Sequence, residues 1–332
     1  MSASASSHFA DPREILVIKP SSLGDIVHAL PAVALLKRRW PEARLRWLIN
    51  SEWAPLLEGH PDIDEIVEFP RRQFRGVRGA LRIAPWAQEL RERMSADLVV
   101  DLQGLLRSAL LARLSCAPGG RIIGPSDARE GARLLYDEAP DVSAPLHAVR
   151  KCLALVEGLG IALPPDPELS FRLPVGKPPA GITLPARFVA LHPFSRGVGK
   201  SLTAAEVEAF CRTLAPTPVV VLGVSDIAAP ALPHVVDLLG QTSLAELIYV
   251  LRQANFVVSV DSGPMHIAAA LTSRLLSLHR WSDPLRVGPF DPEAWVWKDD
   301  YICRVKDLTN ENPRACARTM ESVAEWVRER VE

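Results

Sequence analysis

Apolar residues along the first half of the chain follow two alternating patterns. Runs of four or five apolar residues predict buried strands, and the stretches between them repeat their apolar positions at about helical spacing. The predicted strands are residues 15–19, 44–49, 65–69 and 97–101, and the predicted helices are residues 25–40, 52–59, 81–94 and 107–114. Strands that alternate with helices in this way are typical of an open parallel sheet.

The alternation starts again after a stretch rich in proline. Seven prolines lie between Ile161 and Pro185, a composition typical of a linker. Beyond it, the predicted strands are residues 188–192, 218–222, 256–260 and 274–278, and the predicted helices are residues 204–214, 243–253, 265–271 and 320–331. We therefore predict an α/β protein with two doubly wound, Rossmann-like domains that face each other across a cleft.

The length of 332 residues agrees with two domains. We expect a disordered tail over residues 1–12, a first domain over 13–165, a linker over 166–186, a second domain over 187–312, and a C-terminal helix within 313–332 that packs back on the N-terminal domain.

Composition and charge exclude several classes of protein. The chain is 48% hydrophobic with a net charge of −1, so no overall field attracts nucleic acid. The five cysteines form no CxxC pair and no zinc-like spacing, so no metal or other cofactor is expected. The first residues lack the apolar core of a signal peptide, and no apolar run is long enough to span a bilayer. A cytoplasmic location is the expectation.

The first strand-to-helix turn contains a candidate base. Gly24 permits a tight turn, and Asp25 falls at the start of the helix with its side chain toward the cleft. Asp25 is either a helix-capping carboxylate or a general base that takes a proton from a hydroxyl. The turn contains neither G-x-G-x-x-G nor G-x-x-x-x-G-K-[ST], which argues against dinucleotide binding and P-loop chemistry in this half.

A second strand-to-helix turn, over residues 260–266, is a candidate phosphate site. Ser262 and Gly263 leave backbone N–H groups free at a helix N-terminus. Asp261 would repel phosphate, so it either caps the turn or meets a sugar hydroxyl. His266 lies one turn into the helix and either faces the anion or is a structural histidine.

A glycine-containing loop over residues 192–200 follows the first strand of the second half. It carries Ser195 and ends at Lys200. Such a loop either grips phosphates or is a solvated surface segment.

A basic block lies between Phe69 and Ala87, where no acidic residue occurs. Its members are Arg71, Arg72, Arg75, Arg78 and Arg82. In a chain of net charge −1, this concentration suggests phosphates, carboxylates or a membrane surface as partner, or else a solvated loop.

These motifs in combination resemble glycosyltransferase family 9, the ADP-heptose:lipopolysaccharide heptosyltransferases. The resemblance extends from Ile15 to the C-terminal helix. The matching segments are residues 19–28, 101–108, 127–132 with Tyr136, 147–149, 259–266 and 283–288.

The resemblance implies a GT-B fold and an inverting transfer that requires no metal. It implies Asp25 as catalytic base and Lys200 as the lysine that meets the donor phosphates, so the second domain binds the nucleotide sugar ADP-heptose. Ser195, Asp261, Ser262, Gly263 and His266 match the donor site. Arg71, Arg72, Arg75, Arg129 and His147 match positions near a Kdo-lipid A acceptor on the first domain. A monomer associated peripherally with the inner membrane is then expected.

Three departures from the family pattern lie on the donor side. Leu202 stands where the family often has tryptophan, Ile227 stands where it usually has an acid with Asp226 one position early, and residues 278–283 differ from the usual Phe-Gly-Pro-Thr-Asp-Pro. They are compatible with an altered donor, weakened activity, or a non-catalytic protein that binds a nucleotide sugar or lipid headgroup. A nucleotide-sugar epimerase or hydrolase fits the basic block less well.

Overall fold

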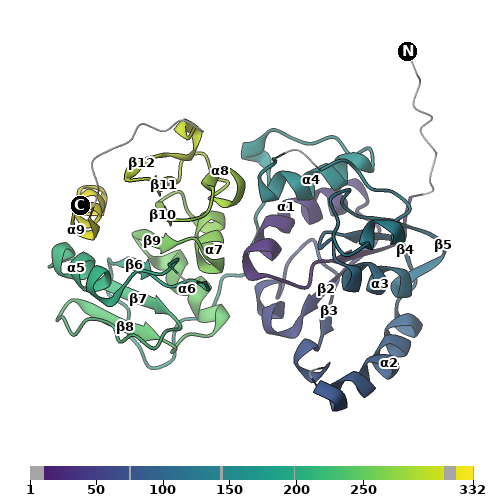
Figure 1. The fold of residues 1–332 in the computed structure, drawn as a ribbon, viewed down its shortest axis with the longest axis horizontal. Helices are drawn as coiled ribbons and strands as arrows, with labels where there is room; N and C mark the ends of the chain where they lie inside the picture. The colour runs from purple at the N-terminus through teal and green to yellow at the C-terminus, as the bar shows by residue number, and fades with distance from the viewer. Residues whose placement is uncertain (1–10, 75, 143–144, 198, 310–318, 332) are drawn as a thin grey trace.

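The structure is a computed structural model that describes residues 11–74, 76–142, 145–197, 199–309 and 319–331. Two α/β domains lie side by side and are joined by an extended segment (Figure 1). Residues 1–10, most of the predicted disordered tail, are outside the described residues, whereas Asp11 accepts a hydrogen bond from Trp40 Nε1 at 2.7 Å.

The first domain is built on a five-stranded parallel sheet in the order β3-β2-β1-β4-β5. Its strands are β1 (Glu14–Ile18), β2 (Arg44–Asn50), β3 (Glu65–Phe69), β4 (Ala96–Asp101) and β5 (Cys116–Ile123). Its helices are α1 (Leu23–Arg39), η1 (Ser51–Leu56), η2 (Arg71–Phe74), α2 (Gly76–Arg93), α3 (Leu106–Ser115), η3 (Ala132–Leu135) and α4 (Ala148–Gly158).

The second domain contains a seven-stranded sheet in the order β12-β11-β10-β9-β6-β7-β8, in which only β12 runs antiparallel to its neighbour. The strands are β6 (Val189–His192), β7 (Val219–Gly223), β8 (Val235–Leu239), β9 (Phe256–Val260), β10 (Leu275–His279), β11 (Trp295–Lys298) and β12 (Tyr301–Arg304). The helices are η4 (Asp166–Glu168) in the linker, then α5 (Ala204–Leu214), α6 (Leu244–Gln253), α7 (Gly263–Leu271), α8 (Pro284–Val287), η5 (Val305–Asp307) and α9 (Met320–Val331).

The two predicted doubly wound domains are confirmed, and so are the predicted central strands. The sequence analysis missed β5, β8, β11 and β12. The start of β5 contains Pro118, Gly119 and Gly120, which have low strand propensity. Residues 52–59 were predicted to be helical, but a short 3₁₀ helix forms there instead, and it contains Pro55.

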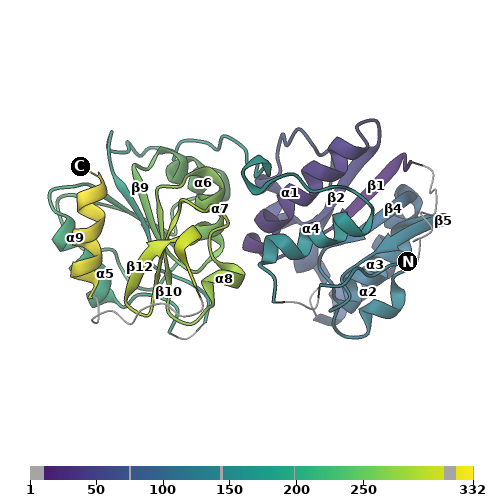
Figure 2. The ribbon, with the colours of Figure 1, turned by 90° about the horizontal axis from the view of Figure 1, so that it is seen from above.

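The prediction that the C-terminal helix returns to the N-terminal domain is wrong. Helix α9 packs against α5 of the second domain, as Figure 2 shows. Its apolar stripe, with Val323 and Val327, lies in the same buried cluster as Phe210 and Leu214 of α5. The apolar side chains of α5 therefore cover the apolar face of α9, which needs no contact with the first domain.

Candidate active site between the two domains

The β1–α1 turn holds Asp25 in both of the roles left open by the sequence. Ser22 is the N-cap of α1 and Asp25 is the third residue of the helix, so the two residues form a capping box. Asp25 Oδ2 accepts hydrogen bonds from Ser22 N at 2.9 Å and Ser22 Oγ at 2.5 Å. The other oxygen, Oδ1, lies 4.0 Å from Lys19 Nζ, and the Asp25 side chain is 43% exposed. Capping thus uses one oxygen and leaves the other open toward a ligand.

Lys19 sets the charge state of this carboxyl group. Burial alone would raise the pKa of Asp25, but Lys19 and the hydrogen bonds from Ser22 outweigh it and hold the pKa below its usual value. The Lys19 ammonium is itself fixed, because it is buried and donates a hydrogen bond of 2.8 Å to the Leu102 carbonyl. Asp25 is therefore ionised at neutral pH, as a general base must be.

A cavity of about 340 Å³ opens beside Asp25 in the first domain. Asp25 and Arg129, both predicted from the sequence, line it. The sequence analysis did not single out the other polar side chains of the lining, which are Lys19, His28, Gln103, Asp127 and Lys151. Lys19 directly follows β1 and Gln103 lies two residues beyond the end of β4, so their position at the carboxyl edge of the sheet could have identified them.

A buried carboxylate shapes one wall of this cavity. Asp101, at the end of β4, accepts hydrogen bonds from Tyr136 Oη at 2.7 Å and Ser108 Oγ at 2.8 Å. It also accepts from the backbone N–H of Gln103 at 2.9 Å. Burial raises the pKa of Asp101, and its hydroxyl partners oppose that shift. These bonds fix the loop of residues 102–104, which lines the cavity.

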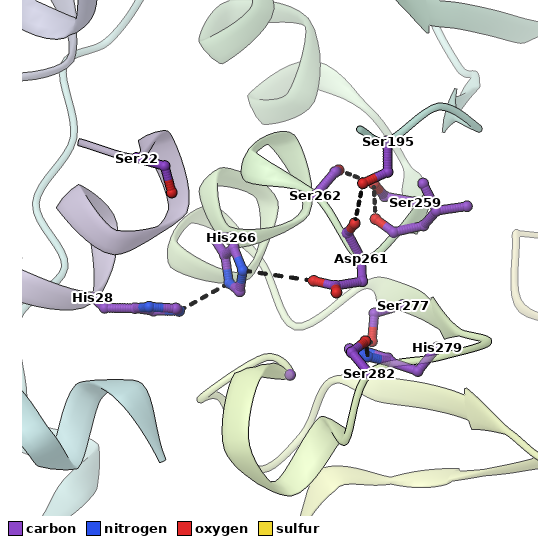
Figure 3. Close-up of polar contacts among 12 residues, drawn as sticks. Ser22, His28, Ser195, Ser259, Asp261, Ser262, His266, Ser277, His279 and Ser282 are labelled. Atoms are coloured by element: carbon purple, nitrogen blue, oxygen red, sulfur yellow. Dashed lines mark hydrogen bonds and ion pairs between the residues drawn. The ribbon is translucent and has the colours of Figure 1, made fainter. Parts of the chain in front are cut away.

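On the second domain, Asp261 lies at the centre of a polar cluster at the β9–α7 turn (Figure 3). Its Oδ2 lies 3.6 Å from Lys200 Nζ, and its Oδ1 lies 4.0 Å from His266 Nε2. Ser195 Oγ donates a hydrogen bond of 2.7 Å to the Asp261 carbonyl. The structure thus brings together the predicted donor residues Ser195, Lys200, Asp261 and His266.

The N-terminus of α7 is not capped by its own serine. Ser262 is the N-cap residue but makes no side-chain capping bond; its Oγ lies 3.2 Å from His192 Nδ1 instead. Ser262 and Gly263 line a cleft of about 640 Å³ that also includes Ser195 from the glycine-containing loop and Ser22 from the first domain. An uncapped helix N-terminus at the wall of a cleft is a favourable place for phosphate oxygens.

The two turns touch across the domain boundary. His28 Nε2 of α1 is hydrogen-bonded to His266 Nδ1 of α7 at 3.0 Å (Figure 3). Glycine makes the close approach possible, since a Cβ on Gly24 would lie 2.4 Å from the His266 ring and a Cβ on Gly263 would lie 2.6 Å from Leu23. Burial lowers the pKa of both histidines, that of His266 to about 4, so both rings are neutral at pH 7.

The predicted acceptor residues are only partly brought together. Arg71 and Arg72 are exposed on η2 and do not line the cavity beside Asp25; Arg72 pairs with Glu52 at 3.0 Å. Arg75 is outside the described residues. His147 lies at the domain boundary, where Nδ1 accepts from Val149 N and Nε2 lies 3.1 Å from the Gly288 carbonyl.

Two of the three departures from the family pattern lie together. Leu202 is buried beneath the loop, and Trp281 packs over Gly199, with its indole N–H donating a 3.1 Å hydrogen bond to the Gly199 carbonyl. A tryptophan therefore reaches the Lys200 loop from residues 278–283. Asp226, one position before Ile227, lines the 640 Å³ cleft, so a carboxylate is available there despite the shift.

Within the described ranges, no group of three or more His, Cys, Asp or Glu side chains is arranged to hold a metal ion. In the same ranges, no helix is both long enough and apolar enough to cross a membrane.

Comparison with known proteins agrees with this architecture. Residues 224–314 match the model of glycosyltransferase family 9 (heptosyltransferase). The chain is 26% identical to lipopolysaccharide heptosyltransferase 1 of Escherichia coli K12, over 93% of this chain and 99% of that protein. It is 29% identical to the Pseudomonas aeruginosa protein of the same name, over 87% and 84%.

Solved structures show the same fold. The E. coli heptosyltransferase WaaC with ADP superposes with a TM-score of 0.73 at 22% identity, covering 96% of this chain and 99% of that one. The E. coli ADP-heptose lps heptosyltransferase II gives a TM-score of 0.75 at 21% identity, over 96% and 98%.

Fold and matches together define a transferase of the GT-B type, as predicted. The match over residues 224–314 and the two heptosyltransferase relatives confirm the resemblance to glycosyltransferase family 9 inferred from the motifs.

Proposed function

We propose that the protein transfers a heptose, with inversion, from ADP-heptose to a Kdo-lipid A acceptor in the synthesis of the lipopolysaccharide inner core. The main support is the meeting of two complementary turns. Asp25, an ionised carboxylate, lines a cavity of the first domain, and its neighbours Ser22 and Gly24 line the cleft at the N-terminus of α7. Lys200 is held next to that turn by Asp261 and can bind an anion there.

In this mechanism, Asp25 Oδ1 removes the proton of the acceptor hydroxyl as the oxygen attacks the anomeric carbon. The bond to the ADP oxygen breaks on the opposite face of the sugar. Lys200 leaves Asp261 to meet the diphosphate, and with the N–H groups at the start of α7 it stabilises the charge that grows on departing ADP. Ser195 and the Ser262–Gly263 turn hold the donor, while Asp261 and His266 support that turn.

The first-domain cavity suits an acidic sugar. Lys19, Arg129 and Lys151 supply cations, and Asp127 pairs with Lys151 at 2.5 Å. Arg71, Arg72 and Arg75 would meet the phosphates of the acceptor from outside the cavity, and His147 would act through the domain boundary rather than on the sugar. We propose a monomer that works peripherally at the cytoplasmic face of the inner membrane.

The test is a transfer assay with purified protein, ADP-heptose and Kdo-lipid A, with the product's anomeric configuration assigned by NMR. An inverted heptoside is expected. Donor hydrolysis without transfer would instead support the hydrolase alternative. Binding of ADP-heptose without turnover would support the non-catalytic alternative that the changes at Leu202, Ile227 and residues 278–283 suggest.

A further inference from the structure

Exposed leucines are concentrated on one part of the first domain. Leu134 of η3 is 86% exposed and Leu81 of α2 is 75% exposed. Ile83 of α2 and Leu106 and Leu110 of α3 are also exposed. Five of the eight large apolar side chains that are exposed among the described residues therefore belong to α2, α3 and η3. We refer to these five side chains as the leucine face.

The three elements that carry the leucine face are neighbours. Helix α3 contacts both α2 and η3, and Figures 1 and 2 both show α2 beside α3 at the side of the domain away from the second domain. Leu106 and Leu110 are one helical turn apart, so they point the same way. Leu106 N also donates a hydrogen bond to Glu130 Oε2, which ties α3 to the segment that leads into η3.

Two segments that carry residues of the leucine face also line the cavity beside Asp25. Leu106 follows Gly104 by two residues, and Leu134 follows Arg129 by five; Gly104 and Arg129 both line that cavity. Arg129 N donates a 2.9 Å hydrogen bond to the Gly104 carbonyl, so the two segments are joined at the cavity wall. The same two segments therefore connect the cavity wall with Leu106 and Leu134 of the leucine face.

Arginines accompany the leucine face. Arg82, Arg107 and Arg133 lie next to its leucines in the sequence and are exposed, and their side chains make no hydrogen bond or ion pair with another described residue. Exposed apolar side chains with unpaired arginines around them complement a surface that offers both acyl chains and negative headgroups.

We propose that the leucine face is a docking surface for an anionic lipid bilayer, which orients the mouth of the acceptor cavity toward the membrane. This inference rests on the proposed function, since a lipid-anchored acceptor gives the orientation its purpose. The saccharide would enter the cavity while its acyl chains stay in the bilayer, so the acceptor need not leave the membrane to react.

The test measures binding of the whole protein to vesicles without any donor or acceptor. The probes are vesicles of phosphatidylcholine with phosphatidylglycerol and vesicles of phosphatidylcholine alone. Wild type is expected to sediment with the anionic vesicles and to dissociate as salt rises. Leu81→Ser with Leu134→Ser should weaken this binding about tenfold or more. Arg107→Gln with Arg133→Gln should weaken it severalfold and reduce the salt dependence.

Val175→Ser is the matched control, because Val175 is 73% exposed but lies in the linker; it should bind vesicles as wild type does. All variants should transfer heptose to a water-soluble acceptor without acyl chains at the wild-type rate. Vesicle binding therefore tests the docking surface, and this transfer rate tests the proposed function. The proposal is overturned if the leucine variant binds vesicles like wild type, if wild type binds neither kind of vesicle, or if sedimentation shows a wild-type dimer that the leucine substitutions dissociate.

Discussion

Each of the two strand-to-helix turns that meet at the domain boundary carries a carboxylate paired with a lysine, and the two pairs have opposite arrangements. Asp25 and Lys19 lie 4.0 Å apart in the first domain, and Asp261 and Lys200 lie 3.6 Å apart in the second. In the first pair the lysine side chain is 9% exposed and the carboxylate 43%. In the second pair the lysine is 38% exposed and the carboxylate 16%.

This inversion separates two kinds of chemistry. The first lysine is fixed by its hydrogen bond to the Leu102 carbonyl, and its charge lowers the pKa of the more exposed Asp25 carboxyl; this favours proton transfer by Asp25. In the second pair, the largely buried Asp261 instead holds the more exposed Lys200 near the cleft, next to Gly199 with its positive φ of 75°. A diphosphate could replace Asp261 as the partner of Lys200. We therefore propose that the same kind of ion pair supplies the base in the first domain and the phosphate ligand in the second.

Replacement of the exposed carboxylate should have the largest effect. Asp25→Asn keeps an oxygen that can accept from Ser22, so α1 remains capped, but it removes the base. Turnover at saturating substrate should fall about 10²–10⁴-fold. Donor affinity by calorimetry and the melting temperature serve as controls and should barely change. A variant with near-normal turnover would falsify the assignment of Asp25.

Replacement of the exposed lysine should rank second. Lys200→Met removes a charge-assisted contact to the diphosphate, and kcat/KM for the donor should fall about tenfold to a hundredfold. ADP affinity should weaken in parallel, while the acid limb of the pH–rate profile stays in place. Unchanged ADP affinity together with unchanged kcat/KM would exclude Lys200 from the phosphate site.

The fixed lysine should act on the pH profile instead. The proposed mechanism requires ionised Asp25, so activity should be lost as pH falls through the pKa of that group. In Lys19→Met, burial is less opposed, the pKa of Asp25 rises, and the acid limb should move to higher pH. We expect about a tenfold loss near that limb and less at high pH. A loss that is equal at every pH would indicate damaged structure rather than a tuned base.

Sequence patterns predicted that the two turns converge, because parallel strands place their carboxyl ends at the same edge of a sheet. Asp25 and residues 261–266 follow β1 and β9, so their convergence on a cleft followed from the alternation of elements alone. The role of Lys19 was missed, since its tuning of Asp25 depends on a hydrogen bond to Leu102, which is distant in the sequence.

Packing partners were the other limit. The apolar stripe of α9 was visible in the sequence. The sequence did not show that α5, and not the first domain, would cover that stripe. The sequence also did not show where the exposed arginines point. The block from Arg71 was predicted to be an acceptor loop, but Arg72 forms an ion pair with Glu52. Arg129, from a different segment, lines the cavity.

The smallest effect should come from the contact that joins the two turns. His28→Ala deletes the cross-domain hydrogen bond to His266 but leaves Asp25, Lys200 and both lysine–carboxylate pairs in place. A single hydrogen bond of this kind shifts an equilibrium about twofold to tenfold. The arrangement in which the two turns touch should be less populated, so KM should rise by that factor while kcat at saturation stays within about twofold.

His234→Ala is a suitable control for that measurement, because His234 also loses a hydrogen bond, to the Cys211 carbonyl, but entirely within the second domain. Small-angle scattering with ADP present should show a larger radius of gyration for His28→Ala than for His234→Ala. Equal radii and equal KM values for the two variants would mean that the two turns hold their relation without the histidine pair, and that glycine-to-side-chain contact at Gly24 and Gly263 alone sets the closed geometry.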